Sequence, residues 1–188
     1  MKKIPTVFER DWDGDRSRVV DKVHSGCEWV LAGEGVATRK LDGTCCLVRG
    51  GNLYKRRELR KGDTSPPLFE VVNRDDETDK TVGWLPCDIG SEDRWHMEAF
   101  SKRNDWPDGT YELVGPKVQG NPEKWPTHEL VTHGSIHEEN PPRTFGGLKT
   151  WLAGRDIEGL VFHHADGRMA KIKLRDFGLK RVPGPLLR

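Results

Sequence analysis

Glycine-containing turns divide the chain from Glu28 onward into apolar segments of about four to eight residues. Gly50-Gly51-Asn52 and Ala165-Asp166-Gly167-Arg168 are both typical of hairpin turns between antiparallel strands. This pattern predicts an α+β fold of mostly antiparallel sheets flanked by short helices. The expected strands are residues 28–31, 36–41, 44–48, 53–57, 68–72, 81–85, 110–114, 129–132, 157–163 and 169–174.

Two other segments have helical character. Residues 92–103 are expected to form a helix with Ser91 as its N-cap and basic residues at its end. Thr144 is expected to cap a short helix over residues 147–152. Residues 183–185, Pro-Gly-Pro, cannot continue a helix or a central strand.

A length of 188 residues is enough for one good hydrophobic core. We therefore expect residues 1–188 to form a single minimal domain without a separate C-terminal domain, and the protein to be a monomer. No apolar run approaches the roughly 20 residues that a membrane helix needs, and no apolar segment follows the N-terminal lysines as in a signal peptide. These features predict a cytoplasmic protein without membrane contact.

Cysteine and histidine spacing gives no sign of a metal site or a disulfide framework. The four cysteines are Cys27, Cys45, Cys46 and Cys87. They contain no C-x-x-C pair, which favours free thiols. His163 and His164 would point away from each other on a strand, so they do not suggest a shared metal ion.

The net charge of +1 does not indicate a polyanionic partner, but cations gather locally in residues 55–61 and 171–180. Such a cluster can be a solvated surface or a binding surface.

The segment Lys40-Leu41-Asp42-Gly43, taken alone, is typical of a strand that runs into a turn. Downstream, Glu112 and Glu158 each precede apolar strand residues, and Lys171 and Lys173 lie on one side of a strand. Carboxylates in such strands are rarely buried without a partner, and two lysines on one face repel unless an anion lies between them. A nucleoside triphosphate with a divalent metal would satisfy all of these groups together.

These segments together resemble the covalent nucleotidyltransferase superfamily, which comprises ATP-dependent RNA and DNA ligases and mRNA capping enzymes. Residues 40–43 match its nucleophile motif, residues 112–115 its third motif, residues 158–162 its fourth and residues 171–173 its fifth. Residues 111–122 are most similar to RNA ligases. The resemblance implies a nucleotidyltransferase (adenylation) domain with the nucleotide in a cleft between sheets.

The activity that this resemblance implies is ATP-dependent RNA ligation. Lys40 would form a lysyl-AMP, AMP would pass to a 5′-phosphate of RNA, and a 3′-hydroxyl would then be joined to that phosphate. A lysine in water has a pKa of about 10.4, so neighbouring cations and burial would have to lower it for attack at neutral pH. The implied cofactors are ATP and Mg²⁺ or Mn²⁺.

The resemblance also implies the role of individual residues. Lys40 is the nucleophile, Lys171 and Lys173 contact the α-phosphate, Glu112 contacts the ribose, and Glu158 serves the metal or its water shell.

Further nucleotide-binding residues are implied around this set. Asp42 and Gly43 belong to the nucleophile motif, and either Arg56 or Arg57 contacts the ribose or the 5′-phosphate, since adjacent strand residues face opposite ways. His133 is the first candidate to stack on the base. Trp125 and His128 are alternatives.

Two features depart from the family pattern. Arg39 stands where many RNA ligases have a glutamate that reads the adenine edge, so base selection must rest on other groups. The additional domain that many ligases carry after the fifth motif is not expected here, so a partner protein would supply grip on the substrate unless the protein is a minimal ligase.

Lys117 and Gln119 are expected to reach a nucleic-acid phosphate.

Other functions remain open on the sequence alone. The chain could be the core of a DNA ligase, with DNA as its partner, or of a capping-type nucleotidyltransferase. It could be a nucleotide- or nucleic-acid-binding domain of the same fold that does not ligate. A protein AMP-transferase or a sensor that stops at the lysyl-adenylate is a further alternative.

Overall fold

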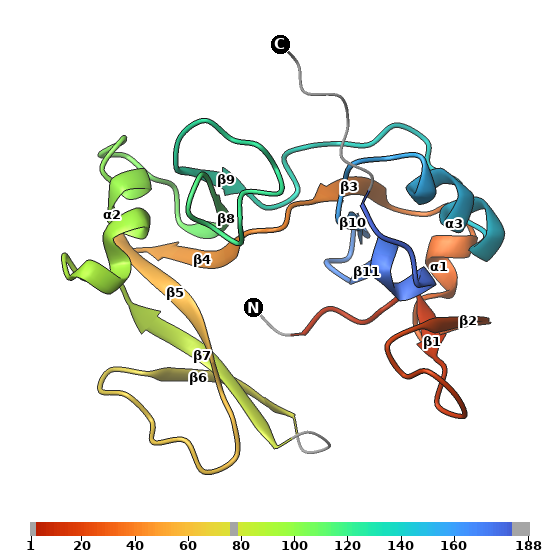
Figure 1. Cartoon of the computed structure of the whole chain (residues 1–188), viewed down its shortest axis with the longest axis horizontal. Coiled ribbons are helices and arrows are strands. Elements are labelled where there is room, and N and C mark those ends of the chain that lie inside the picture. The colour runs from red at the N-terminus through yellow and green to blue at the C-terminus, as the bar shows by residue number, and fades with distance from the viewer. Residues whose placement is uncertain (1–2, 76–78, 182–188) are drawn as a thin grey trace. The chain divides into compact units, whose positions relative to one another are not determined.

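The computed structural model describes residues 3–75 and 79–181, which divide into two compact units. The inserted unit contains residues 42–133 together with Lys3. The flanking unit contains residues 4–41 and 134–181, which precede and follow the insertion in the sequence. Figure 1 shows the helices and strands of each unit. The expectation that residues 1–188 form a single domain without a separate C-terminal domain stays a prediction.

A six-stranded sheet forms the inserted unit, in the order β6-β7-β5-β4-β8-β9 with neighbouring strands antiparallel. The strands are β4 (Thr44–Arg49), β5 (Asn52–Leu59), β6 (Glu70–Asp75), β7 (Lys80–Pro86), β8 (Gly109–Val114) and β9 (Glu129–Thr132). Gly50 and Gly51 connect β4 to β5 with φ angles of 56° and 72°, a left-handed conformation that suits glycine. The predicted hairpin is confirmed.

The helix α2 (Arg94–Phe100) covers one face of this sheet after the 3₁₀ turn η1 (Ser91–Asp93). Its residue Ala99 packs with Cys46 and Leu53 in the core of the inserted unit. The prediction that Ser91 caps this helix is wrong, because Ser91 is already inside η1 and α2 starts only after Asp93. The side chain of Asp93 is occupied by other groups, so it provides no cap hydrogen bond either.

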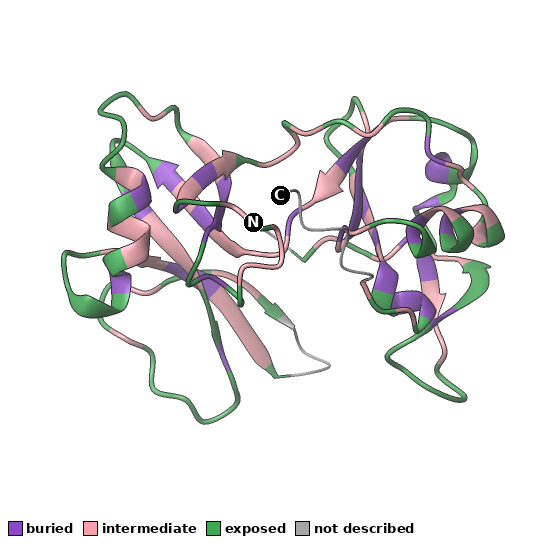
Figure 2. Ribbon diagram, turned by 45° about the horizontal axis from the view of Figure 1, so that its top comes forward, coloured by how far each residue is buried: buried purple, intermediate pink, exposed green. Residues whose placement is uncertain are grey.

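The flanking unit contains a three-stranded antiparallel sheet in the order β11-β10-β3 and a two-stranded hairpin. The sheet strands are β3 (Val36–Lys40), β10 (Gly159–His163) and β11 (Met169–Lys173), the hairpin strands are β1 (Phe8–Arg10) and β2 (Val19–Val23), and the helical elements are α1 (Glu28–Leu31), α3 (Phe145–Ala153) and η2 (Leu174–Phe177). One face of the sheet and α3 enclose a core that includes Leu148, Leu152, Leu160 and Phe162. Along α3, buried residues alternate with half-buried and exposed ones (Figure 2).

The prediction of a strand over residues 28–31 is wrong, since these residues form the single helical turn α1. Trp29 and Val30 are both buried, whereas a strand would place adjacent residues on opposite faces. Ala32 N–H donates to Glu28 O, which closes the turn. The helix predicted after Thr144 is confirmed, and the Thr144 side chain accepts a hydrogen bond from Gly147 N–H.

Other boundaries also differ from the sequence expectations. The strand expected over residues 68–72 begins only at Glu70, because Leu68 has a φ of 62° that does not fit a strand. The strands β1 and β2 were not expected in the polar N-terminal stretch. Residues 183–185, which were expected not to continue a helix or a central strand, lie outside the described residues.

The prediction of an α+β chain of mostly antiparallel sheets with short helices is confirmed. All four cysteines are free, as expected. Burial raises the pKa of the Cys46 thiol, and it raises that of Cys87 to about 12, so neither is a thiolate at neutral pH. In the described part of the chain, none of the helices has the length and apolar character needed to cross a bilayer.

Candidate active site

Lys40, Gly159 and Lys173 lie side by side across the three strands of the flanking unit. The register pairs Gly159 of β10 with Lys40 of β3 on one side and with Lys173 of β11 on the other. A Cβ atom on Gly159 would lie 2.1 Å from Ile172 O, so only glycine fits between the two lysine strands at this distance. The row therefore brings two ammonium groups to one end of the sheet.

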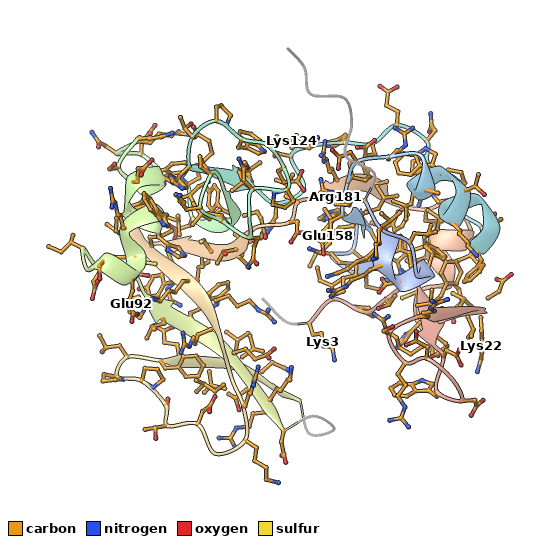
Figure 3. All side chains as sticks on the ribbon, in the orientation of Figure 1. Lys3, Lys22, Glu92, Lys124, Glu158 and Arg181 are labelled. Carbon is orange, nitrogen blue, oxygen red and sulfur yellow. The ribbon has the colours of Figure 1, made fainter. Side chains whose placement is uncertain are left out.

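Glu158, the residue before this glycine, joins the two lysines. Its Oε2 is 2.5 Å from Lys40 Nζ and its Oε1 is 2.7 Å from Lys173 Nζ. The Glu158 side chain is only 13% exposed. Figure 3 labels Glu158 among the side chains. Burial alone would raise its pKa, but the ammonium groups of Lys40 and Lys173 outweigh burial and hold the pKa of Glu158 below the ordinary value.

Lys171 adds a third cation on the same face, two residues before Lys173 on β11. Burial, followed by the repulsion of Lys173 and Lys40, lowers the pKa of Lys171 to about 8. Within residues 3–75 and 79–181, its ammonium group forms no ion pair. Glu158 thus pairs with two of the three lysines, and both Glu158 and Asp176 attract the third, Lys171.

Asp176 and Arg10 support this cluster and were not found by sequence reasoning. Asp176 is almost fully buried, accepts a hydrogen bond from Lys173 N–H at 2.9 Å and pairs with Arg10 at 2.9 Å. The only sequence signal for this role is an aspartate three residues after the last residue of a strand, which is common in turns.

In the inserted unit, Glu112 of β8 and Gly43 are in direct contact. Gly43 N–H donates to Glu112 Oε1 at 3.0 Å, and Glu112 is 8% exposed. A Cβ atom on Gly43 would lie 2.2 Å from Leu113 O, so the glycine of the Lys40–Gly43 segment is needed for this close approach to β8.

His133 holds the other oxygen of Glu112. Its Nε2 is 2.7 Å from Glu112 Oε2, while its Nδ1 is buried with no hydrogen-bond partner among the described residues. The predicted stacking residue is therefore positioned edge-on against the carboxylate. The two remaining lone pairs of Glu112 are available to a further donor.

The sheet register separates Arg56 from Arg57. Lys55 pairs with Cys46, whose side chain lies in the core beneath α2, so Arg57 projects to that face and Arg56 to the other. Glu112 pairs with Cys45 and projects to the same face as Arg56. The Nε of Arg56 is buried without a hydrogen-bond partner in the described ranges, whereas Arg57 is exposed.

The other predicted residues occupy varied positions. Asp42 N–H donates to Glu123 Oε1 at 3.2 Å, a contact that the sequence did not predict because Glu123 lies in a loop without a motif. His128 is 4% exposed and stacks on Trp95, which leaves no open ring face for a base. Trp125 is half-buried. Lys117 and Gln119 are exposed.

Residues next to the lysine cluster face elsewhere. Arg39 pairs with Leu160, whose side chain is in the core, so Arg39 projects to the face opposite Lys40 and donates to Asp156 O at 3.2 Å. His163 contacts Thr38 at 2.9 Å, whereas His164 contacts Glu34 at 2.8 Å.

The cationic segment 55–61 is partly neutralised by carboxylates. Lys55 pairs with Asp93, and Lys61 pairs with Asp79. A cavity of about 340 Å³ lies at its end, with Arg60 and Arg74 in its lining.

The class of the protein follows from comparison with known families: residues 91–185 match the model of a ligase family, described as RNA ligase 1. RNA ligase 1 of Danio rerio is 38% identical over an alignment that covers 96% of this chain and 82% of that protein. The RNA ligase 1 proteins of Pongo abelii and Rattus norvegicus are 35% and 26% identical, each with 77% of this chain and 67% of the relative covered. This chain belongs to the RNA ligase 1 family.

The matched residues 91–185 include Glu112, Glu158, Lys171 and Lys173, whereas Lys40 precedes them.

Proposed function

We propose that the protein is an ATP-dependent RNA ligase that forms a lysyl-AMP at Lys40. The observation that carries this proposal is the cluster of Lys40, Lys171 and Lys173 around the single carboxylate of Glu158. These three lysines and Arg10 outnumber the carboxylates of Glu158 and Asp176, which leaves an excess of positive charge that a phosphate group would neutralise. The name of the family, RNA ligase 1, agrees with phosphate chemistry on nucleic acid.

In the proposed first step, Lys40 Nζ attacks the α-phosphorus of ATP. The Nζ–P bond forms, the bond from the α-phosphorus to the bridging oxygen breaks, and pyrophosphate leaves with the electron pair of that bond. Lys40 gives up one proton to solvent to become the attacking amine and a second as the Nζ–P bond forms, so it must first leave its ion pair with Glu158. Lys171 and Lys173 would stabilise the charge that develops on the α-phosphate.

The residues present fit a divalent metal such as Mg²⁺ or Mn²⁺ in the manner typical of phosphoryl-transfer sites. Such ions use one or two carboxylates together with substrate phosphates, and Glu158 is a half-buried carboxylate beside the proposed nucleophile. When bound, the metal would neutralise negative charge on the phosphates. Both oxygens of Glu158 contact lysines, so this carboxylate would exchange Lys40 for the metal or its water shell.

The groups around Glu112 are proposed to bind the nucleoside. Two polar atoms on this side of the sheet, Arg56 Nε and His133 Nδ1, are buried without a hydrogen-bond partner among the described residues. Such groups are costly unless a ligand or water satisfies them. Glu112 would accept from a ribose hydroxyl with the lone pairs that Gly43 and His133 leave free.

The later steps transfer AMP to RNA and then release it. An oxygen of the RNA 5′-phosphate attacks the lysyl-AMP phosphorus, the N–P bond breaks, and Lys40 takes up a proton. The 3′-hydroxyl then attacks the 5′-phosphorus, loses its proton, and AMP leaves. RNA as the substrate is inferred from the family name and from the similarity of residues 111–122 to RNA ligases.

The test is to incubate the full chain with α-labelled ATP and Mg²⁺, denature it and measure label on the protein. We expect a covalent adduct that is lost in Lys40→Ala and retained in Lys149→Ala, an exposed lysine of α3. An adduct that persists in Lys40→Ala would refute the nucleophile assignment. Label from GTP in preference to ATP would refute the choice of nucleotide.

The substrate is tested separately with 5′-phosphorylated single-stranded RNA, nicked RNA and nicked DNA. Sealing of RNA supports the proposal. Sealing of DNA alone would assign a DNA ligase, and an adduct without any sealing would assign a protein that stops at the lysyl-adenylate.

A further inference from the structure

Three potential metal ligands gather in the inserted unit, on the α2 face of its sheet and apart from the face of Glu112. Cys87 directly follows β7, Asp93 ends η1, and His96 lies in the first turn of α2. Their ligand atoms all lie within 4.8 Å of one another. The sequence did not suggest this set because the spacing Cys-x₅-Asp-x₂-His matches no common zinc motif.

His96 supplies the observation that calls for a ligand. Both of its ring nitrogens are buried, and neither has a hydrogen-bond partner among the described residues. Asp93 Oδ1 is 3.6 Å from His96 Nδ1, too far for a hydrogen bond. A buried imidazole without a hydrogen-bond partner carries a free-energy cost that a bound ion would remove.

The charge around the cluster also favours a cation. Asp93 is 3% exposed and accepts from Lys55 Nζ at 2.6 Å and from Asp88 N–H at 3.2 Å. Glu92 is a second carboxylate within 3.8 Å of the same ammonium. Glu92 lies at the start of this helical segment (Figure 3). Lys55 is thus one cation for two carboxylates.

The backbone holds these side chains in place. Cys87 N–H donates to Leu53 O at 2.9 Å, which fixes the cysteine against β5. Asp88 accepts from Gly90 N–H at 2.7 Å, which closes the turn before η1. Asp93 and His96 are three residues apart, a spacing that brings side chains together on a helix. These contacts hold the three ligand side chains near one another even when no metal is bound.

We propose that Cys87, Asp93 and His96 form a binding site for a divalent transition metal of the zinc class. Thiolate, imidazole and carboxylate are the ligands that Zn²⁺ takes, at about 2.0–2.3 Å, with water suited to the fourth position. The side chains would close by about 1 Å to reach these distances. On binding, the Cys87 thiol releases its proton to solvent, and His96 binds as the neutral ring.

The consequence of this site is structural, since it links the end of β7 to η1 and α2. It does not depend on the proposed ligase activity.

The test titrates the full chain, stripped of metal with a chelator, with Zn²⁺ and with Co²⁺. We expect one equivalent to bind, a rise in melting temperature, and a near-ultraviolet thiolate-to-Co²⁺ charge-transfer band. Cys87→Ser and His96→Gln should each lower the affinity by about 100-fold or more and remove the band or shift it. Cys45→Ser, a half-buried cysteine outside the cluster, should leave both unchanged.

Lys55→Met keeps all three ligands and removes the competing positive charge. We expect it to bind Zn²⁺ about tenfold more tightly than the wild type, because like charges repel at this separation. Affinity that is unchanged or weaker in Lys55→Met would contradict the site. Absence of the charge-transfer band in the wild type, or a band that survives the double change C87S/H96Q, would overturn the proposal.

Discussion

The ammonium group of Lys40 lies 2.5 Å from Glu158 Oε2, so the proposed nucleophile is held as one half of an ion pair. The other oxygen of Glu158 holds Lys173 at 2.7 Å. We expect Glu158→Gln to lower the free energy of unfolding by about 3–5 kcal/mol at pH 7, because both ammonium groups lose their charged partner while half-buried. Urea unfolding measures this, and the same variant should fail to form the AMP adduct.

The pH dependence gives a second check on Glu158. The lysines lower the pKa of this carboxyl below its ordinary 4.5, so the stabilisation is present above pH 4.5 and is lost as the pH falls through the lower folded value. The stability difference between wild type and Glu158→Gln should therefore shrink in acid. As a control, Glu34→Gln removes an exposed pairing with His164 and should cost less than about 1 kcal/mol. A Glu158→Gln cost as small as this would contradict the prediction.

Removal of the Lys171 charge should stabilise the protein. The difference between 10.5 and about 8 in its pKa corresponds to about 3 kcal/mol of unfavourable free energy for the charged form when folded. We expect Lys171→Met to raise the free energy of unfolding by about 1–3 kcal/mol at pH 7 and to form little adduct. Between pH 8 and 10.5 the unfolded wild type binds more protons than the folded wild type, so the wild type becomes more stable as the pH rises. The stability gain of Lys171→Met over the wild type therefore declines in this range.

Lys149→Met, at an exposed position of α3, is the matched control and should change stability by less than about 0.5 kcal/mol. A loss of stability in Lys171→Met would show that the ammonium has a favourable partner.

The proposed affinity for ATP should fall as the pH rises above about 8, because Lys171 then loses its proton and its attraction for phosphate. In Lys171→Arg the charge persists through this range, since a guanidinium does not deprotonate. We therefore expect the KM for ATP in adduct formation to rise several-fold between about pH 7 and 9 in the wild type and to stay nearly constant in Lys171→Arg. Parallel profiles would argue against a phosphate contact by Lys171.

The two arginines of β5 should behave differently. Arg56 shares a face of the sheet with Glu112, and its Nε lacks a partner among the described residues, whereas Arg57 projects to the other face. We expect Arg56→Ala to reduce the rate of adduct formation or of sealing about 10- to 100-fold, which corresponds to one charge-assisted hydrogen bond. Arg57→Ala should remain within about threefold of the wild type. The reverse order of effects would show that the face assignment is wrong.

Gly43→Ala should damage both stability and activity. The new Cβ would lie 2.2 Å from Leu113 O and 2.9 Å from Glu112 Cγ, so the backbone must shift and the Gly43–Glu112 hydrogen bond weakens. We expect a loss of about 1–3 kcal/mol in the free energy of unfolding. Gly146→Ala, in the first turn of α3 where a Cβ meets nothing within 4 Å, should be neutral or stabilising. Thermal unfolding of the two variants compares them directly.

Local patterns were sufficient to predict most strands and the face shared by Lys171 and Lys173, because strand alternation depends on neighbouring residues only. The same alternation showed that Arg56 and Arg57 diverge, but only the register with β4 tells which one lies beside Glu112. The turn α1 was missed because residues 28–31 are apolar enough for either state, and tertiary packing decides between them.

Long-range pairings could not be predicted from the pattern of residues. Lys40 and Glu158 are 118 residues apart in sequence, and Asp42 and Glu123 are 81 apart. His133 was expected to stack on a base, and its contact with Glu112 depends on how β9 lies against β8. The division into two separate hydrophobic cores could not be predicted either, because hydrophobic residues are distributed similarly along the whole chain.

The pairing of β3 with β10 has a consequence for synthesis on the ribosome. β3 emerges early, but its neighbour in the sheet follows only after the whole of the inserted unit has been made. Residues 42–133 contain all the strands of their own sheet and are free to fold first. Lys40 therefore lies on a strand without its sheet neighbour β10 until translation reaches Glu158, and a chain that stalls before that point carries the lysine without the carboxylate that pairs with it.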